Sequence, residues 1–216
     1  APANGSLAVT AALMLPALAN ASTTADVKLV GTITPASCVP AFVGGNTIDY
    51  VHIASSSLNA TAQTMLPEQT TKLSVTCDAP VKFAFSLVDE RAATAVTTLN
   101  TISGYDAGNK FGLGAADNGA KIGAYSLQIS NEVADSGATQ RLTSVDSGAT
   151  WAVFGGGMRN NNLVAFASTA SATVPSPHKS ITVDMRVVAA IDKSSNLPIT
   201  ADIKIDGLTT FEVKYL

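Results

Sequence analysis

The sequence is poor in charge. Asp, Glu, Lys and Arg make up 13% of its 216 residues, against roughly 25% in ordinary soluble domains. The formal net charge is -3 and no cluster of Lys or Arg occurs, so the chain lacks the electrostatic footprint of a nucleic-acid-binding protein. It also lacks a basic amphipathic stretch for an anionic membrane. We therefore expect that the protein does not bind nucleic acid and does not insert into a membrane.

Residue types that carry catalysis or hold metals are also scarce. Histidine occurs only as His52 and His178, and neither lies in a Gly-x-Ser-x-Gly setting. The two cysteines match no zinc-ligand spacing. Phe111-Gly112-Leu113-Gly114 is not followed by the Lys-Ser/Thr pair of a phosphate loop, and Asp89-Glu90-Arg91 is typical of a solvated turn. We expect no enzymatic activity, no cofactor and no metal site.

Only one long apolar run is present. Residues 7–18 are almost wholly apolar and are followed by Ala19-Asn20-Ala21. The run is shorter than the roughly 20 residues of a membrane-spanning helix, and its small-residue end is typical of a secretory signal near its cleavage site. We expect residues 1–21 to be a signal-peptide remnant and residues 22–216 to be the exported chain. The alternative is a retained, donor-like strand, because the odd-numbered residues of the run would share one face.

The cysteines, Cys38 and Cys77, follow this export-type segment. In an oxidising compartment two cysteines are expected to pair, so we predict a disulfide between them. Two buried free thiols are the alternative. If bridged, the cysteines close a loop of about forty residues, which the chain-entropy model values at roughly 4 kcal/mol.

The dominant period of the remaining sequence is two. Apolar residues alternate with polar ones in several short segments, which is the pattern of half-buried strands. Gly- and Asn-rich clusters separate them, and we expect Asp78-Ala79-Pro80 to be such a turn. Residues 133–176 should form long loops with strands around 151–154 and 163–166. The other predicted strands are residues 27–33, 73–77, 81–87, 181–191, 203–205 and 211–215. The sequence therefore predicts one all-β sandwich domain.

Gly31 lies in an alternating segment seven residues before Cys38, and the chain ends on Phe211-Glu212-Val213-Lys214-Tyr215-Leu216. In these features it resembles the pilin subunits of chaperone–usher fimbriae. The resemblance implies an immunoglobulin-like sandwich that lacks its last strand, with a disulfide between its first two strands. It also implies that a periplasmic chaperone fills the gap first, and that the N-terminal extension of a neighbouring subunit, here residues 22–35, replaces it later.

This resemblance assigns roles to two sets of residues. The donor strand would use Val27, Leu29, Gly31 and Ile33, and the strand that a chaperone pairs with would carry Phe211, Val213 and Tyr215. The physical reason is general. A sandwich short of one strand exposes apolar side chains and unpaired backbone groups, and an extended peptide with alternating apolar side chains satisfies both by β-strand addition.

A narrower resemblance covers most of the chain. The motifs that carry it are Cys38-Val39-Pro40, Gly44-Gly45, Asp49-Tyr50, Ser57-Leu58-Asn59, Thr76-Cys77-Asp78-Ala79-Pro80, Asp89-Glu90-Arg91, Phe111-Gly112-Leu113-Gly114, Asn118-Gly119-Ala120-Lys121-Ile122-Gly123-Ala124 and Tyr215-Leu216. In these the chain is similar to the GltF-like family of exported proteobacterial proteins, often described as fimbrial-like. We therefore expect a structural fimbrial or fimbrial-like subunit, in the periplasm or on the cell surface. The alternative function is a self-contained module that binds a glycan or envelope component, with residues 133–176 as a binding surface.

Overall fold

The computed structural model describes residues 25–137 and 139–216, and within them it is built from strands and four short 3-10 turns. None of its helical turns is long and apolar enough to cross a membrane. The strands are β1 (Cys38–Val43), β2 (Thr64–Met65), β3 (Gln69–Val81), β4 (Phe83–Asp89), β5 (Phe111–Gly112), β6 (Gly123–Ala134), β7 (Gln140–Ser144), β8 (Ala152–Val153), β9 (Leu163–Ala167), β10 (His178–Ile191) and β11 (Thr209–Tyr215).

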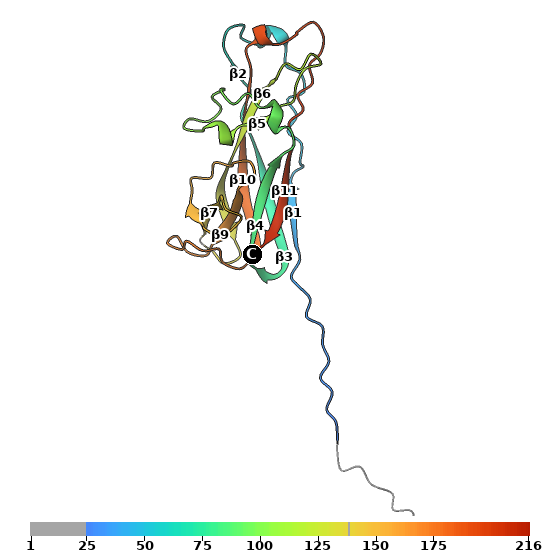
Figure 1. The fold of residues 1–216 in the computed structure, drawn as a ribbon, viewed down its shortest axis with the longest axis vertical. Helices are drawn as coiled ribbons and strands as arrows, with labels where there is room; N and C mark the ends of the chain where they lie inside the picture. The colour runs from blue at the N-terminus through green and yellow to red at the C-terminus, as the bar shows by residue number, and fades with distance from the viewer. Residues whose placement is uncertain (1–24, 138) are drawn as a thin grey trace, which may run out of the picture. The chain divides into compact units, whose positions relative to one another are not determined.

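These strands form two antiparallel sheets that face each other (Figure 1). One sheet has the order β1-β3-β10-β6-β5, with β2 also on β10, and the other has the order β11-β4-β9-β7-β8. The all-β sandwich fold is thus confirmed. The first four strands of one sheet follow the order A-B-E-D of an immunoglobulin domain, and β11-β4 follows the order F-C. Among the described residues no strand occupies the place of strand G beside β11.

The core lies between the sheets and is filled by alternate residues of the long strands. Leu73 and Val75 of β3, Leu87 of β4, Ile129 of β6 and Val183 of β10 are all at most 1% exposed. The inner strand β4 differs from the predicted alternation, because Ala84 and Ser86, which point away from the core, are buried as well. Its Ala84 packs in a second small cluster with residues of β9 and with the partly buried Trp151.

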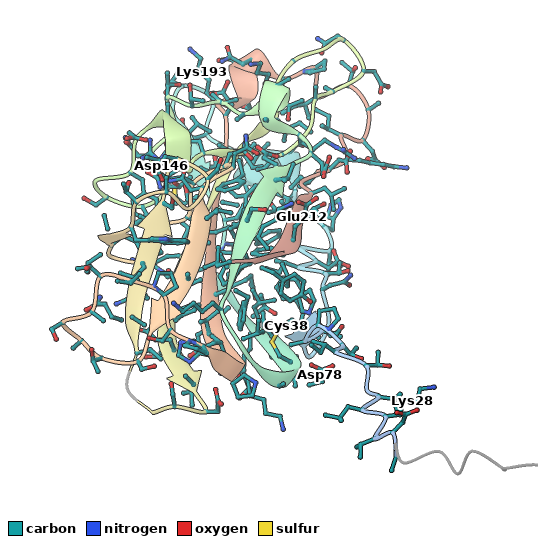
Figure 2. The ribbon with its side chains drawn as sticks, turned by 60° about the horizontal axis from the view of Figure 1, so that its bottom comes forward. Lys28, Cys38, Asp78, Asp146, Lys193 and Glu212 are labelled. Carbon is teal, nitrogen blue, oxygen red and sulfur yellow. A yellow bond between two sulfur atoms is a disulfide. The ribbon has the colours of Figure 1, made fainter. Side chains whose placement is uncertain are left out.

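The predicted disulfide is present. Cys38 and Cys77 face each other across the β1–β3 ladder with their Cα atoms 4.0 Å apart, and Cys77 is 2% exposed. Figure 2 shows the bond beside Asp78, near the end of β3. The bond therefore fastens the edge strand β1 to the body of its sheet.

Two predicted details are wrong. Asp78-Ala79-Pro80 is not a turn, because β3 continues through it to Val81 and the chain changes sheets at Lys82. Pro80 is tolerated there because the β3–β10 ladder is irregular close by, between His178 and Ser180. Residues 203–205 form no strand either; the chain from 192 to 208 has only one 3-10 turn.

Residues 133–176 contain more regular structure than predicted. The expected strands around 151–154 and 163–166 are present as β8 and β9. The region also contains β7, which pairs with both β8 and β9. β7 has little apolar alternation to predict it, because its two buried residues are Leu142 and the polar Ser144.

The chain divides into two units, residues 1–34 and 35–216. Within the first unit, residues 25–34 form no strand, and the side chains of Val27, Leu29 and Ile33 are 86%, 89% and 99% exposed. The prediction of a half-buried strand at residues 27–33 is therefore wrong for this state of the chain. The predicted signal peptide or retained strand at residues 1–21 lies outside the described residues.

Candidate β-strand addition site

Two edge strands of different sheets lie side by side, β1 and β11 (Figure 1). Among the described strands β1 pairs only with β3, and β11 pairs only with β4. Their contact is made by side chains: the rings of Phe42 and Phe211 meet edge to face with centroids 5.3 Å apart. Phe211 also lies against Phe85 of β4, at 6.1 Å. We call this side of the sandwich the open side; it consists of β1, β11, residues 48–58 after β1 and residues 197–205 before β11.

In the described part of the chain, no strand pairs with the outer edge of β11. Glu90 N–H donates to Leu208 O at 3.0 Å, and Leu216 N–H donates to Lys82 O at 3.1 Å. Because bonded and non-bonded positions alternate in an antiparallel ladder, the even-numbered residues of β11 bond β4. The odd-numbered residues point their N–H and C=O groups outward, away from β4. Three of these are the residues that the pilin resemblance assigned: Phe211, Val213 and Tyr215.

The side chains of those residues face the open side. Phe211 and Val213 are partly buried against the main core, whereas Glu212 and Lys214 are exposed and pair with each other at 2.7 Å. Tyr215 is 54% exposed. The strand thus presents apolar side chains and free hydrogen-bonding groups at the same residues, which is what a pairing strand requires.

The edge of β1 has fewer outward N–H groups available for an added strand than the edge of β11. Asp78 N–H donates to Ser37 O at 3.0 Å, so the odd-numbered residues of β1 bond β3 and the even-numbered ones point outward. Of these, Cys38 already donates its N–H to the Tyr215 hydroxyl at 2.8 Å, and Pro40 has no N–H. Only Phe42 keeps an outward donor, so an added strand would pair mainly with β11.

An open cleft of about 800 Å³ extends this side beyond the two strands. Residues 48–58, which follow β1, form one wall, residues 197–205, which precede β11, form the other, and Ile122 and Ile191 lie at its base. Neither wall forms a strand. The partly buried apolar residues of the walls are Ile48, Tyr50, Ile53, Leu58, Ile203 and Ile205.

Tyr50 has an unusual environment within the cleft. Its hydroxyl is buried and has no hydrogen-bond partner in the part of the chain that the structure describes, and burial raises the pKa of the phenol. A buried polar group without a partner costs about 1–3 kcal/mol. One wall of the cleft therefore contains a buried hydroxyl group that lacks a hydrogen bond within the described residues.

The residues assigned to the donor strand belong to the other unit of the chain. Val27, Leu29 and Ile33 are exposed, and a Cβ atom added to Gly31 would meet nothing within 4 Å. Sequence reasoning missed the cleft walls and Phe42. The pattern that could have indicated the two walls is a short apolar alternation, Ile48-Asp49-Tyr50 on one wall and Ile203-Lys204-Ile205 on the other.

Ser136, His178 and Asp135 lie close together, but their geometry differs from that of a catalytic triad. His178 is 2% exposed; its Nδ1 lies 3.0 Å from Ser136 Oγ and 4.0 Å from Asp135 Oδ1, and its Nε2 lies 3.1 Å from Phe166 O. In a catalytic triad the acid and the nucleophile bind opposite ring nitrogens, whereas here both lie at Nδ1. Asp135 also accepts the N–H of Ser180 at 3.1 Å, so the group ties the β6–β7 turn to β10. Residues 25–137 and 139–216 contain no cluster of metal ligands.

Comparison with known proteins found a matching family model and a relative that aligns with most of the chain. A family model described as "Protein of unknown function (DUF1120)" matches residues 27–126. Protein GltF of Escherichia coli (strain K12) is 30% identical over an alignment of 232 positions, gaps included, which covers 93% of this chain and 91% of that protein. The chain belongs to the GltF-like family. In this GltF-like chain the family match includes both bridged cysteines and the cleft wall after β1, and it ends before β11.

Proposed function

We propose that this GltF-like chain is a structural fimbrial or fimbrial-like subunit of the bacterial cell envelope, which associates by β-strand addition at its open side. The observation that supports this most strongly is the edge of β11. This strand has the position of strand F in an immunoglobulin domain, and its outward N–H and C=O groups lie where strand G would pair.

The open side also suits such a strand energetically. An exposed edge is a template for pairing with another chain. The cleft and the Phe42–Phe211 contact place apolar surface along the same side. An added strand would supply backbone bonds to β11 and insert every second side chain between the sheets, completing the core.

Residues 26–35 of a second copy are the proposed occupant. Val27, Leu29 and Ile33 are apolar, alternate in sequence and are at least 86% exposed. Burying a side chain of this kind is worth about 1.5–3 kcal/mol, so the segment gains by docking. Gly31 would lie where the added strand passes closest to the body. In the periplasm a chaperone strand would hold the open side before a neighbouring subunit does, and export would depend on a signal at residues 1–21.

A synthetic peptide of residues 26–35 tests this proposal. Added to the full chain at about 100 times its dissociation constant, it should raise the thermal midpoint by roughly 5–10 °C. A control peptide with Leu29→Asp should give no shift, because a carboxylate would be buried in the core. Equal midpoints with and without the native peptide, from a chain that stays monomeric at high concentration, would remove the proposal.

A further inference from the structure

A second cavity, of about 360 Å³, lies between β6, β7 and the loops at residues 104–109 and 154–159. Its walls include Tyr105, Asn109, Gln128, Phe154 and Arg159. The volume is in the range of small-ligand sites. We propose that this cavity binds an uncharged pyranose sugar.

The first observation is an unpaired donor in the cavity wall. The Tyr105 hydroxyl is buried and has no hydrogen-bond partner among the described residues, and burial raises the pKa of the phenol, so it stays protonated. A Cβ atom at Gly157 would lie only 2.7 Å from this oxygen. Glycine is therefore the residue that can pack against this hydroxyl, which is left without a bond that a ligand hydroxyl reaching it would supply.

The second observation is that three arginines around the cavity are paired with carboxylates. Arg159 lines the cavity, Arg141 donates to Gly155 O at 3.4 Å, and Arg186 donates to Gln128 Oε1 at 3.2 Å. Each of the three pairs with a carboxylate: Arg159 with Asp106 at 2.9 Å, Arg141 with Glu132 at 3.2 Å and Arg186 with Glu68 at 2.6 Å. None of these three arginines is left unpaired for a phosphate or carboxylate. Lys110, whose ammonium lies 5.9 Å from the centre of the Tyr105 ring, donates to Thr101 Oγ1 and to Tyr105 O. Both facts favour a neutral ligand.

The third observation is the mixture of surfaces. Tyr105 and Phe154 supply aromatic walls, and Gly104, Gly155 and Gly157 leave the backbone accessible. The side-chain amide of Gln128 and the hydroxyl of Thr143 add polar groups. A pyranose has an apolar C–H face and a rim of hydroxyl groups, and it can use both kinds of wall at once.

The cavity is separate from the open side. None of its lining residues belongs to β1, β11 or the two cleft walls. Strand addition would therefore leave it free, so sugar binding does not depend on the proposed assembly and can fail or succeed independently of it.

The test uses the full chain and a panel of methyl pyranosides (glucoside, galactoside, mannoside and N-acetylglucosaminide), with binding followed by saturation-transfer NMR and titration. At least one member should bind. Tyr105→Phe should weaken that binding about tenfold or more, the loss expected for one buried hydrogen bond. It should leave the thermal midpoint unchanged or slightly raised, because the hydroxyl makes no bond within the described protein.

Tyr50→Phe is the matched control, since it removes the other buried, unpartnered tyrosine hydroxyl, which lies in the cleft. It should leave sugar binding unchanged. Gly155→Val is a second, steric variant at a lining residue. A Cβ there meets nothing within 4 Å, so the fold should persist, and the bulkier lining should weaken sugar binding. Absence of saturation transfer to every sugar, or equal affinity of the wild type and Tyr105→Phe, would overturn the proposal.

Discussion

The hydroxyl of Tyr215 on β11 accepts a hydrogen bond of 2.8 Å from the backbone N–H of Cys38 on β1. This bond joins the edges of two different sheets. It lies beside the disulfide that fastens β1 to β3, so one end of the open side is held by a covalent bond and a hydrogen bond together. Farther along the same side, β1 and β11 are joined by the contact between the rings of Phe42 and Phe211.

Tyr215→Phe should therefore loosen this end. The substitution removes the acceptor of the Cys38 N–H and keeps the ring. We expect a loss of about 0.5–1.5 kcal/mol in the free energy of unfolding and faster hydrogen exchange at the Cys38 amide, measured by denaturant titration and NMR. Tyr105→Phe is a suitable control, because its hydroxyl has no partner in the described chain. An unchanged Cys38 exchange rate would contradict the assignment of this bond.

The disulfide should contribute much of the stability. Cys38 and Cys77 are 39 residues apart in sequence, and replacing both with alanine should cost roughly 4 kcal/mol. Chemical denaturation of the oxidised chain and of the double variant measures this difference. A double variant with the same unfolding midpoint as the wild type would show that β1 is held by other contacts.

The contact between Phe42 and Phe211 should couple the two edge strands. A double-mutant cycle with Phe42→Ala and Phe211→Ala should give an interaction energy of about 0.5–1.5 kcal/mol. The control cycle combines Phe211→Ala with Val39→Ala, because Val39 is 63% exposed and its side chain points away from the core. Additive effects in the first cycle would mean that the rings do not hold β1 and β11 together.

Acid should weaken the turn that follows β7. Hydrogen bonds from Thr150 and Ser144 lower the pKa of Asp146 to about 2, from an ordinary value of 3.8. Because the folded pKa is depressed, this carboxylate contributes stability that is present above about pH 3.8 and is lost as the pH falls towards 2. Thermal midpoints between pH 5 and 2 should therefore fall less steeply for Asp146→Asn than for the wild type. The exposed Asp117→Asn serves as the control, and identical slopes for Asp146→Asn and the wild type would count against the role of Asp146.

The sequence predicted the parts of the fold that depend on periodicity. The long alternations of β3, β4 and β10 gave the sandwich, because only one strand face can pack between two sheets. The sequence-based prediction failed where pairing with a neighbouring strand determines the local structure. Asp78-Ala79-Pro80 reads as a turn, yet a ladder irregularity lets Pro80 stay in β3.

The candidate site was only partly predictable for a similar reason. The resemblance to pilin subunits assigned Phe211, Val213 and Tyr215 to a pairing strand, but which backbone groups of β11 point away from β4 depends on the register between the two strands. The cleft walls include Tyr50 and Ile203, which meet only after folding because they lie about 150 residues apart in the chain. No local pattern reports such a meeting.

Amide hydrogen exchange of the full chain, with and without the peptide of residues 26–35, tests the central claim most directly. We predict that the N–H groups of Phe211 and Val213 gain protection when the peptide is added. Those of Glu212 and Lys214, assigned to bonds with β4, should change little. Unaltered exchange at Phe211 and Val213 at saturating peptide, or protection confined to other strands, would contradict the claim that β11 is completed by a borrowed strand.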